Sequence, residues 1–174
     1  MIFATSIVLI VTVIGLPSFY VIQQNHLLIE QVNRFVAHVQ LARSQAVRNN
    51  QVTSICSRGN GLTCERERIK QKIYEAGWLV YLDTDENNDY NSTQDKLITT
   101  AGAVTHGVTI RSENNHGSRL NFNPTGMLNE IGSIQVIFCG KDGSTETVPG
   151  RMVKINPAGY TSVKKQAAGD SCVL

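Results

Sequence analysis

Residues 2–49 decide the fold, and they read IFATSIVLIVTVIGLPSFYVIQQNHLLIEQVNRFVAHVQLARSQAVRN. No Asp, Glu, Lys or Arg occurs before Glu30, and apolar side chains dominate the run from Ile2 to Val21. An uncharged apolar stretch of about 20 residues is long enough to cross the bilayer core as a helix. We therefore predict that residues 1–24 form a hydrophobic half-helix suited to a membrane or a filament core, with a kink before Pro17.

The second part of this stretch has the periodicity of an amphipathic helix. Its apolar residues recur at alternating four- and three-residue steps, so they share one helical face: Leu28, Val32, Phe35, Val39, Ala42 and Ala46. Asn49 and Asn50 supply a helix stop. Because such a face must be covered, residues 25–50 are predicted to pack on the rest of the chain, in a helix roughly 70 Å long overall.

The apolar run has two other interpretations. A cleaved signal peptide has a basic start and a shorter apolar core, and the sequence has neither feature. A single-span membrane anchor stays open, because hydrophobicity does not distinguish an anchor from a helix that packs with other helices.

From Gln51 onward the period changes to short β-like runs separated by turn residues. About 120 residues are left for this part, enough for one compact domain, and the net charge of +2 does not favour nucleic-acid binding. We predict an α+β fold in which the helix packs on a small antiparallel β-rich head, residues 51–174. The predicted strands are Val52–Cys56, Trp78–Leu82, Leu97–Thr100, Val108–Arg111, Arg119–Phe122, Ile134–Cys139, Met152–Ile155 and Tyr160–Val163, and the charged segment Glu65–Lys72 is either a loop or a short helix.

Four cysteines follow this export-type segment, and their even number indicates an oxidising compartment outside the cytoplasm. Pairing near with near gives two disulfides, Cys56 to Cys64 and Cys139 to Cys172, among three connectivities. A zinc site is the competing interpretation. It is disfavoured because the chain has no C-x-x-C motif and no close pair among its scattered histidines, His26, His38, His106 and His116.

The segment from Asp83 to Asp95 carries oxygen ligands at alternate positions, as the first half of an EF-hand loop does. The candidate calcium ligands are Asp83, Asp85, Asn87 and Asp89. The similarity ends where Asn88 takes the place of the turn glycine, and Asp95 comes one step later than the bidentate Glu. The alternative is a solvated acidic hairpin. No other cofactor is expected, and the absence of catalytic motifs predicts that the protein is not an enzyme and has no small-molecule substrate.

Several segments together resemble the GspH/FimT family of type IV minor pilins and type II secretion pseudopilins. They are LARSQAVRNNQV at 41–52, GWLVYLD at 77–83 and FNPTG at 122–126. The closing pattern, GRMVKI at 150–155 followed by a late Cys172, is similar to that of FimU-like pilus members. The resemblance implies a long helix that packs into a filament or its priming complex and an α+β head that is exposed outside.

The resemblance also implies a function. It predicts a minor pilin of a Gram-negative bacterium that initiates or caps a type IV pilus. Its partners would be other minor and major pilins, bound through the N-terminal helix. The protein would lie in the inner membrane with a periplasmic head, and later in the pilus at the cell surface. Two alternatives are a minor pseudopilin of a type II secretion system and a DNA receptor at the pilus tip, with Arg151, Lys154, Lys164 and Lys165 contacting phosphates.

Two features depart from the family pattern. Members begin with Phe-Thr-Leu-Ile-Glu after a glycine, whereas this sequence begins Met1-Ile2-Phe3, so we expect a true start upstream that supplies Gly-Phe-Thr-x-x-Glu. Members implicated in DNA uptake carry a Gly-Arg-x-Arg tail, whereas Gly159 is followed here by Tyr160. We therefore expect DNA binding to be weak.

Overall fold

The computed structural model describes residues 2–65, 74–104, 107–112, 118–140 and 148–166. A long helix, α1 (Ile2–Asn49), precedes all of the described strands and continues through Pro17 without a break. The strands are β1 (Thr53–Ser57), β2 (Trp78–Leu82), β3 (Lys96–Ala101), β4 (Val108–Ser112), β5 (Arg119–Phe122), β6 (Ile134–Gly140), β7 (Arg151–Ile155) and β8 (Thr161–Lys165). This arrangement confirms the predicted α+β fold.

Every predicted strand is present, and the ends differ by at most two residues. The largest difference is in β8, which begins after Tyr160 because the Tyr160 N–H donates to Asn156 Oδ1 and completes the preceding turn. The pairing of β8 with β7 extends to Lys165, two residues beyond the predicted end of the strand. The segment Glu65–Lys72, predicted as a loop or short helix, lies outside the described residues except for Glu65.

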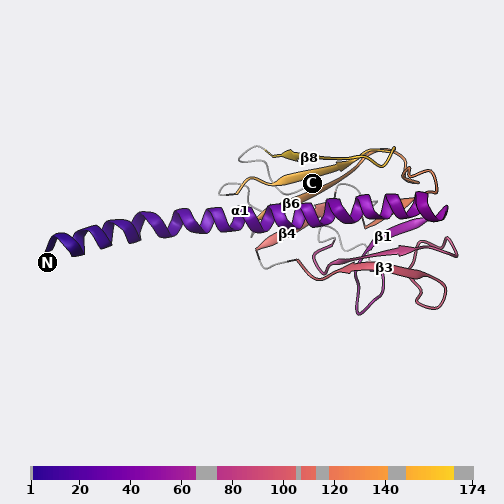
Figure 1. Ribbon diagram of the computed structural model, residues 1–174, viewed down its shortest axis with the longest axis horizontal. Helices are drawn as coiled ribbons and strands as arrows, with labels where there is room; N and C mark the ends of the chain where they lie inside the picture. Colours follow the sequence, from indigo (N-terminus) through magenta and orange to yellow (C-terminus); the bar gives the residue numbers. More distant parts are fainter. Residues whose placement is uncertain (1, 66–73, 105–106, 113–117, 141–147, 167–174) are drawn as a thin grey trace.

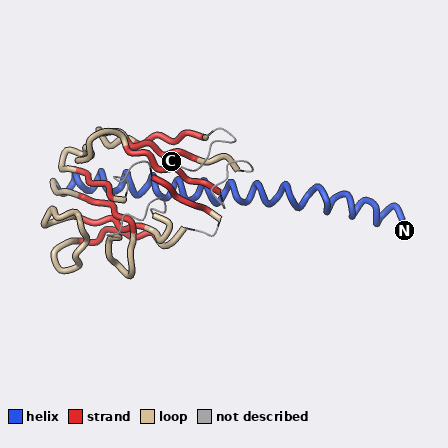
Figure 2. Tube along the Cα trace, turned by 180° about the vertical axis from the view of Figure 1, so that it is seen from behind, coloured by secondary structure: helices blue, strands red, loops and turns tan. Residues whose placement is uncertain are grey.

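The strands form two antiparallel sheets, with the orders β3-β2-β1-β5 and β4-β6-β7-β8. In Figure 1, β1 and β3 of the first sheet lie on one side of α1 and β8 of the second sheet lies on the other, and Figure 2 shows the same arrangement from behind. The helix therefore packs against both sheets, and its apolar face joins them.

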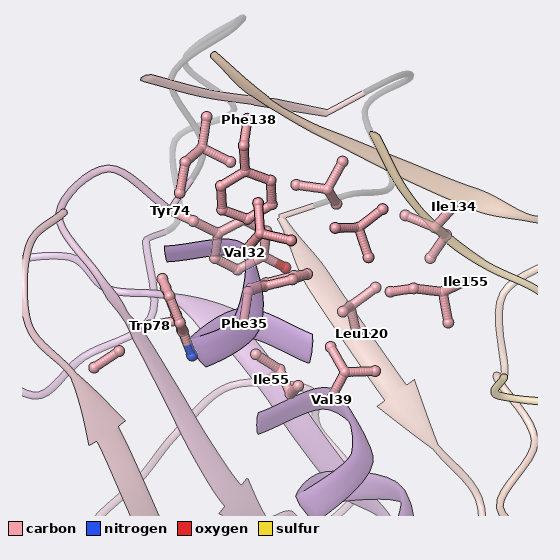
Figure 3. Packing of buried hydrophobic residues seen from close by; sticks show 14 of the residues in the cluster. Val32, Phe35, Val39, Ile55, Tyr74, Trp78, Leu120, Ile134, Phe138 and Ile155 are labelled. Atoms are coloured by element: carbon pink, nitrogen blue, oxygen red, sulfur yellow. The ribbon is translucent and has the colours of Figure 1, made fainter. Parts of the chain in front are cut away.

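The core lies where the second half of α1 meets the two sheets (Figure 3). All six residues of the predicted apolar face, from Leu28 to Ala46, are buried. The Phe35 ring lies 5.2 Å from Tyr74, 5.3 Å from Trp78 and 5.6 Å from Phe138, measured between centroids. Since Trp78 belongs to β2 and Phe138 to β6, one helical side chain connects both sheets.

The first sheet is also covered on its outer face. Every residue of β1 and β2 is buried, because a second apolar cluster of Cys56, Cys64, Leu79 and Tyr81 lies opposite the helix side. Tyr90 closes this cluster, with its ring centroid 5.3 Å from that of Tyr81. This contact fixes the acidic segment between β2 and β3 against the sheet.

Candidate functional site

The two halves of α1 have different surroundings. Figure 1 shows the N-terminal half projecting beyond the head, whereas the C-terminal half lies along it. From Val21, where burial is first described, Val21 and Ile22 are exposed, and Leu28 is the first residue with no exposed surface. The head makes contact slightly earlier, because Arg151 Nη2 donates to Asn25 Oδ1 at 3.1 Å.

Among the residues that the structure describes, no helix is long and apolar enough to cross a membrane. The membrane role predicted for the first half of the helix stays a prediction.

Polar contacts fix how the second half of α1 sits on the first sheet. The buried Trp78 donates from Nε1 to His38 Nδ1 at 2.9 Å, and the Arg34 guanidinium lies 5.2 Å from the Trp78 ring centroid. Burial, and then the positive charge of Arg34, lower the pKa of His38. The neutral imidazole accepts the hydrogen bond from Trp78, and a protonated one could not.

The end of the helix is held by two turns of the same sequence type, Asn-Pro-x-Gly at 123–126 and 156–159. Arg43 Nε donates to the Gly126 carbonyl at 3.0 Å, and its guanidinium lies 4.3 Å from the ring centroid of Tyr160. Gly126 and Gly159 both have positive φ, and a Cβ on Gly159 would come within 2.4 Å of the Gly126 carbonyl oxygen. The two turns therefore require glycine, and they meet at one arginine of the helix.

The role of Arg43 was not predicted. Arg43 contacts Gly126, which lies 83 residues later in the chain, and Tyr160, which lies still further along. The repeated Asn-Pro-x-Gly pattern is the signal that could have suggested that the two turns act together.

The acidic segment brings together a set of ligands that differs from the predicted one. Carboxylate oxygens of Asp83, Asp85 and Asp95 lie within 4.8 Å of one another. Asp89, which was predicted as a ligand, faces Arg119 Nη2 at 3.5 Å. Asn87 Oδ1 accepts from the Asp89 N–H at 2.7 Å and shapes the turn. Asp95 therefore takes the place that the EF-hand spacing gave to Asp89.

Asp83 is the most deeply buried member of this cluster, with no exposed surface. Its Oδ2 accepts from the Asn88 N–H at 2.9 Å and from Ser54 Oγ at 3.3 Å, whereas its Oδ1 has no hydrogen-bond partner. Burial raises the pKa of Asp83, and the neighbouring carboxylates of Asp95 and Asp85 raise it further. The two hydrogen bonds, from Asn88 and Ser54, lower the pKa but do not cancel this rise.

The four residues proposed to contact DNA do not form one surface. Lys154 pairs with Ser162 and Met152 pairs with Lys164, so Lys154 and Lys164 share one face of the sheet. Arg151 pairs with Lys165, and both point to the other face. The Arg151 guanidinium is already bound by the Pro149 carbonyl and by Asn25 Oδ1. The exposed cations are therefore divided between two faces.

The structure contains a disulfide between Cys56 and Cys64, which links β1 to the segment that follows it. Cys139 in β6 is also disulfide-bonded. Cys172, its predicted partner, lies outside the described residues. The first bridge is part of the cluster that covers the outer face of the first sheet.

The family can now be identified from the sequence. The profile of a family described as Type II transport protein GspH matches residues 31–159, which is most of the chain. The chain belongs to the GspH family. The matched range runs from the buried half of α1 through both Asn-Pro-x-Gly turns. Membership confirms the family that the sequence motifs predicted.

Solved structures share the fold of this GspH family member. The type IV minor pilin FimU of Pseudomonas aeruginosa is similar, with 19% identity, a TM-score of 0.60, and coverage of 83% of this chain and 94% of that chain. The minor pseudopilin EpsH of the type 2 secretion system of Vibrio cholerae has 11% identity, a TM-score of 0.52, and coverage of 78% and 94%. No curated protein matches the chain.

Proposed function

We propose that this protein is a minor pilin that initiates or caps type IV pilus assembly, with a structural and not an enzymatic role. One observation carries the proposal: the apolar face of the second half of α1 is buried in the protein's own head, while the apolar first half projects beyond it. An uncharged apolar helix needs a cover of lipid or of other helices. Neighbouring pilin helices supply that cover in this proposal.

The proposed location follows from the same division. The first half of α1 lies in the inner membrane before assembly and among other pilin helices afterwards. The head lies in the periplasm and then on the pilus, outside the reducing cytoplasm. The disulfide between Cys56 and Cys64 supports this location, because such bonds persist in oxidising compartments.

A pilus is favoured over a secretion system by the closing sequence pattern. FimU and EpsH share the fold with this chain at low identity, so the fold does not decide between them. The Gly150-Arg151-Met152 segment and the late Cys172 resemble FimU-like members, and on this ground we choose the pilus.

A gene deletion tests the proposal. The deletion strain is expected to lose surface pili, counted by electron microscopy, and to keep type II secretion of exoproteins into the medium. Complementation with Leu9→Asp, in the projecting half of α1, should fail to restore pili. Complementation with Ile131→Asp, at a fully exposed head position, should restore them. Lost secretion with normal pili would instead identify a pseudopilin.

DNA binding is the weaker alternative, because the exposed lysines are divided between two faces and Arg151 is held internally. Few phosphates would be neutralised, so the affinity of the full chain for duplex DNA should be low and its salt dependence shallow. A submicromolar affinity near physiological salt that is lost in Lys164→Ala/Lys165→Ala would support the receptor role.

A further inference from the structure

Three carboxylates gather at one end of the first sheet, close to the residues that follow α1, since the Asp83 N–H donates to the Val52 carbonyl at 3.0 Å. Leu82 pairs with Lys96 at the end of the β2 and β3 ladder, so Asp83 and Asp95 are adjacent as the chain leaves one strand and enters the other. Asp85 lies two residues further along the loop. One carboxylate oxygen from each of the three lies within 4.8 Å of the others.

The most deeply buried member of the cluster points to a missing ligand. Asp83 has no exposed surface, and its Oδ1 is buried without a hydrogen-bond partner. A buried polar atom without a partner is costly, and most such atoms in folded proteins are paired with protein, water or an ion. Because the neighbouring acidic groups are the carboxylates of Asp85 and Asp95, a cation is the partner that would both bind this oxygen and offset the negative charge around it.

The protein itself does not supply that positive charge within the described residues. No ion pair joins Asp83, Asp85 or Asp95 to a described lysine or arginine. The nearby Arg119 is used elsewhere, since it pairs with Asp89 and donates to the Asn88 carbonyl. Three carboxylates so close together repel one another unless a cation or a proton lies among them.

We propose that Asp83, Asp85 and Asp95 form a calcium site. Carboxylate oxygens are the preferred ligands of Ca²⁺, which binds them at about 2.3–2.6 Å. Two oxygens on opposite sides of the ion are therefore about 5 Å apart, and the three oxygens of the cluster fit on that sphere. Asp85 is exposed and gives the ion a route from solvent, while Asp83 and Asp95 form the buried side.

The surroundings hold Asp95 and the middle of the loop in place before an ion arrives. Both oxygens of Asp95 accept backbone hydrogen bonds, from the Thr84 N–H at 2.9 Å and from the Asn91 N–H at 2.8 Å. Packing of Tyr90 on Tyr81 fixes the middle of the loop against the sheet. A cation would therefore bind a loop that is already ordered, and its effect would be on local stability.

The test uses the full chain in detergent micelles and CaCl₂ at constant ionic strength. At about 100 times its dissociation constant, Ca²⁺ should raise the midpoint of thermal unfolding by about 5–10 °C. Isothermal titration should give a dissociation constant in the range of extracellular sites, about 0.1–1 mM. Mg²⁺ should give a smaller shift, because it requires a tighter octahedral set of ligands.

Variants of one loop separate the site from general charge effects. Asp85→Asn removes an exposed ligand, so it should fold normally and bind Ca²⁺ at least tenfold more weakly. Glu86→Gln removes an equal charge from an exposed neighbour outside the cluster, and it should keep the calcium response. Asp83→Asn should also abolish the response, and if that variant fails to fold, Asp85→Asn decides the question.

The proposal is overturned if about 10 mM Ca²⁺ leaves the unfolding midpoint unchanged, since even the weak extracellular sites would be mostly filled at that concentration. It is also overturned if Asp85→Asn and Glu86→Gln respond to Ca²⁺ equally. The proposal does not depend on the pilus assignment, because its readouts are binding and stability of the isolated protein.

Discussion

The two halves of α1 form one continuous helix, but different groups cover their apolar side chains. From Leu28 to Ala46, one apolar face is buried by two sheets of the same chain. The N-terminal half of the helix projects beyond the head, and no Asp, Glu, Lys or Arg occurs before Glu30. The described residues of this chain account for the burial of the second half, whereas the proposed function assigns the cover of the first half to lipid and to other pilin helices.

The polar residues show the same difference. The second half carries Arg34, His38 and Arg43, each of which contacts a specific group in the head. These contacts fix the rotation of the helix about its own axis. The first half has no Asp, Glu, Lys or Arg to form such contacts, so packing of apolar side chains must determine its neighbours.

The largest expected effect is from Phe35→Ala in the buried half. Phe35 contacts three aromatic rings and has no exposed surface, so truncation should lower the free energy of unfolding by about 3–5 kcal/mol. Urea unfolding of the full chain, followed by the fluorescence of the single Trp78, measures this change. The control is Ile22→Ala, at a residue 52% exposed, which should change stability by less than about 0.5 kcal/mol.

The second effect concerns the head and should leave the first half of the helix unaffected. Replacing both Cys56 and Cys64 by serine opens a short loop and should lower the free energy of unfolding by about 2–3 kcal/mol. The same urea titration, compared with the wild type under non-reducing conditions, gives the value. An unchanged midpoint would show that the covalent link adds nothing to the apolar cluster around it.

A smaller effect is expected for Arg43→Ala, which removes one hydrogen bond and one cation–π contact between α1 and the two turns. The loss should be about 1–2 kcal/mol. Arg48→Ala is the matched control, because Arg48 is exposed and bonds only to Gln45 of its own helix among the hydrogen bonds described. Equal losses in the two variants would contradict the role assigned to Arg43.

The smallest effect is a pH dependence in the buried half. Because the pKa of His38 is lower in the folded protein than its ordinary value of 6.5, the unfolded chain binds the proton more readily. The contribution of neutral His38 to stability is therefore fully present above pH about 6.5, and it is lost as the pH falls toward the pKa of His38 in the folded protein. His38→Gln, which keeps an acceptor for Trp78, should show a shallower loss between about pH 7 and 5. An equally steep loss would assign the dependence to other groups.

Periodicity was sufficient to predict the fold. The face from Leu28 to Ala46 carries its burial pattern in the local sequence, and turn residues separate the short strands, including the fully buried β1 and β2, so both could be assigned without tertiary information. The ends of β8 were less certain, because a side-chain hydrogen bond from the preceding turn sets where the strand begins.

The contacts between distant residues could not be predicted in the same way. Asp95 joins Asp83 because of the pairing between β2 and β3, and not through the spacing of an EF-hand loop. Arg119, far along the chain, draws Asp89 away from the cluster. Likewise, Arg43 meets Gly126 and Tyr160 only after both sheets have formed. The local sequence placed these residues in a helix, a strand or a turn, but only the pairing and packing of the strands determined which of them come into contact.

The most direct test of the central claim is site-specific photo-crosslinking at one position in each half of α1, in cells that make pili. A photoreactive residue at Leu9 should give covalent adducts with other pilins, identified by mass spectrometry. The same residue at Val39, which is buried in the head, should give no intermolecular adduct. Adducts from Leu9 with lipid alone, or equal pilin adducts from both positions, would contradict the account.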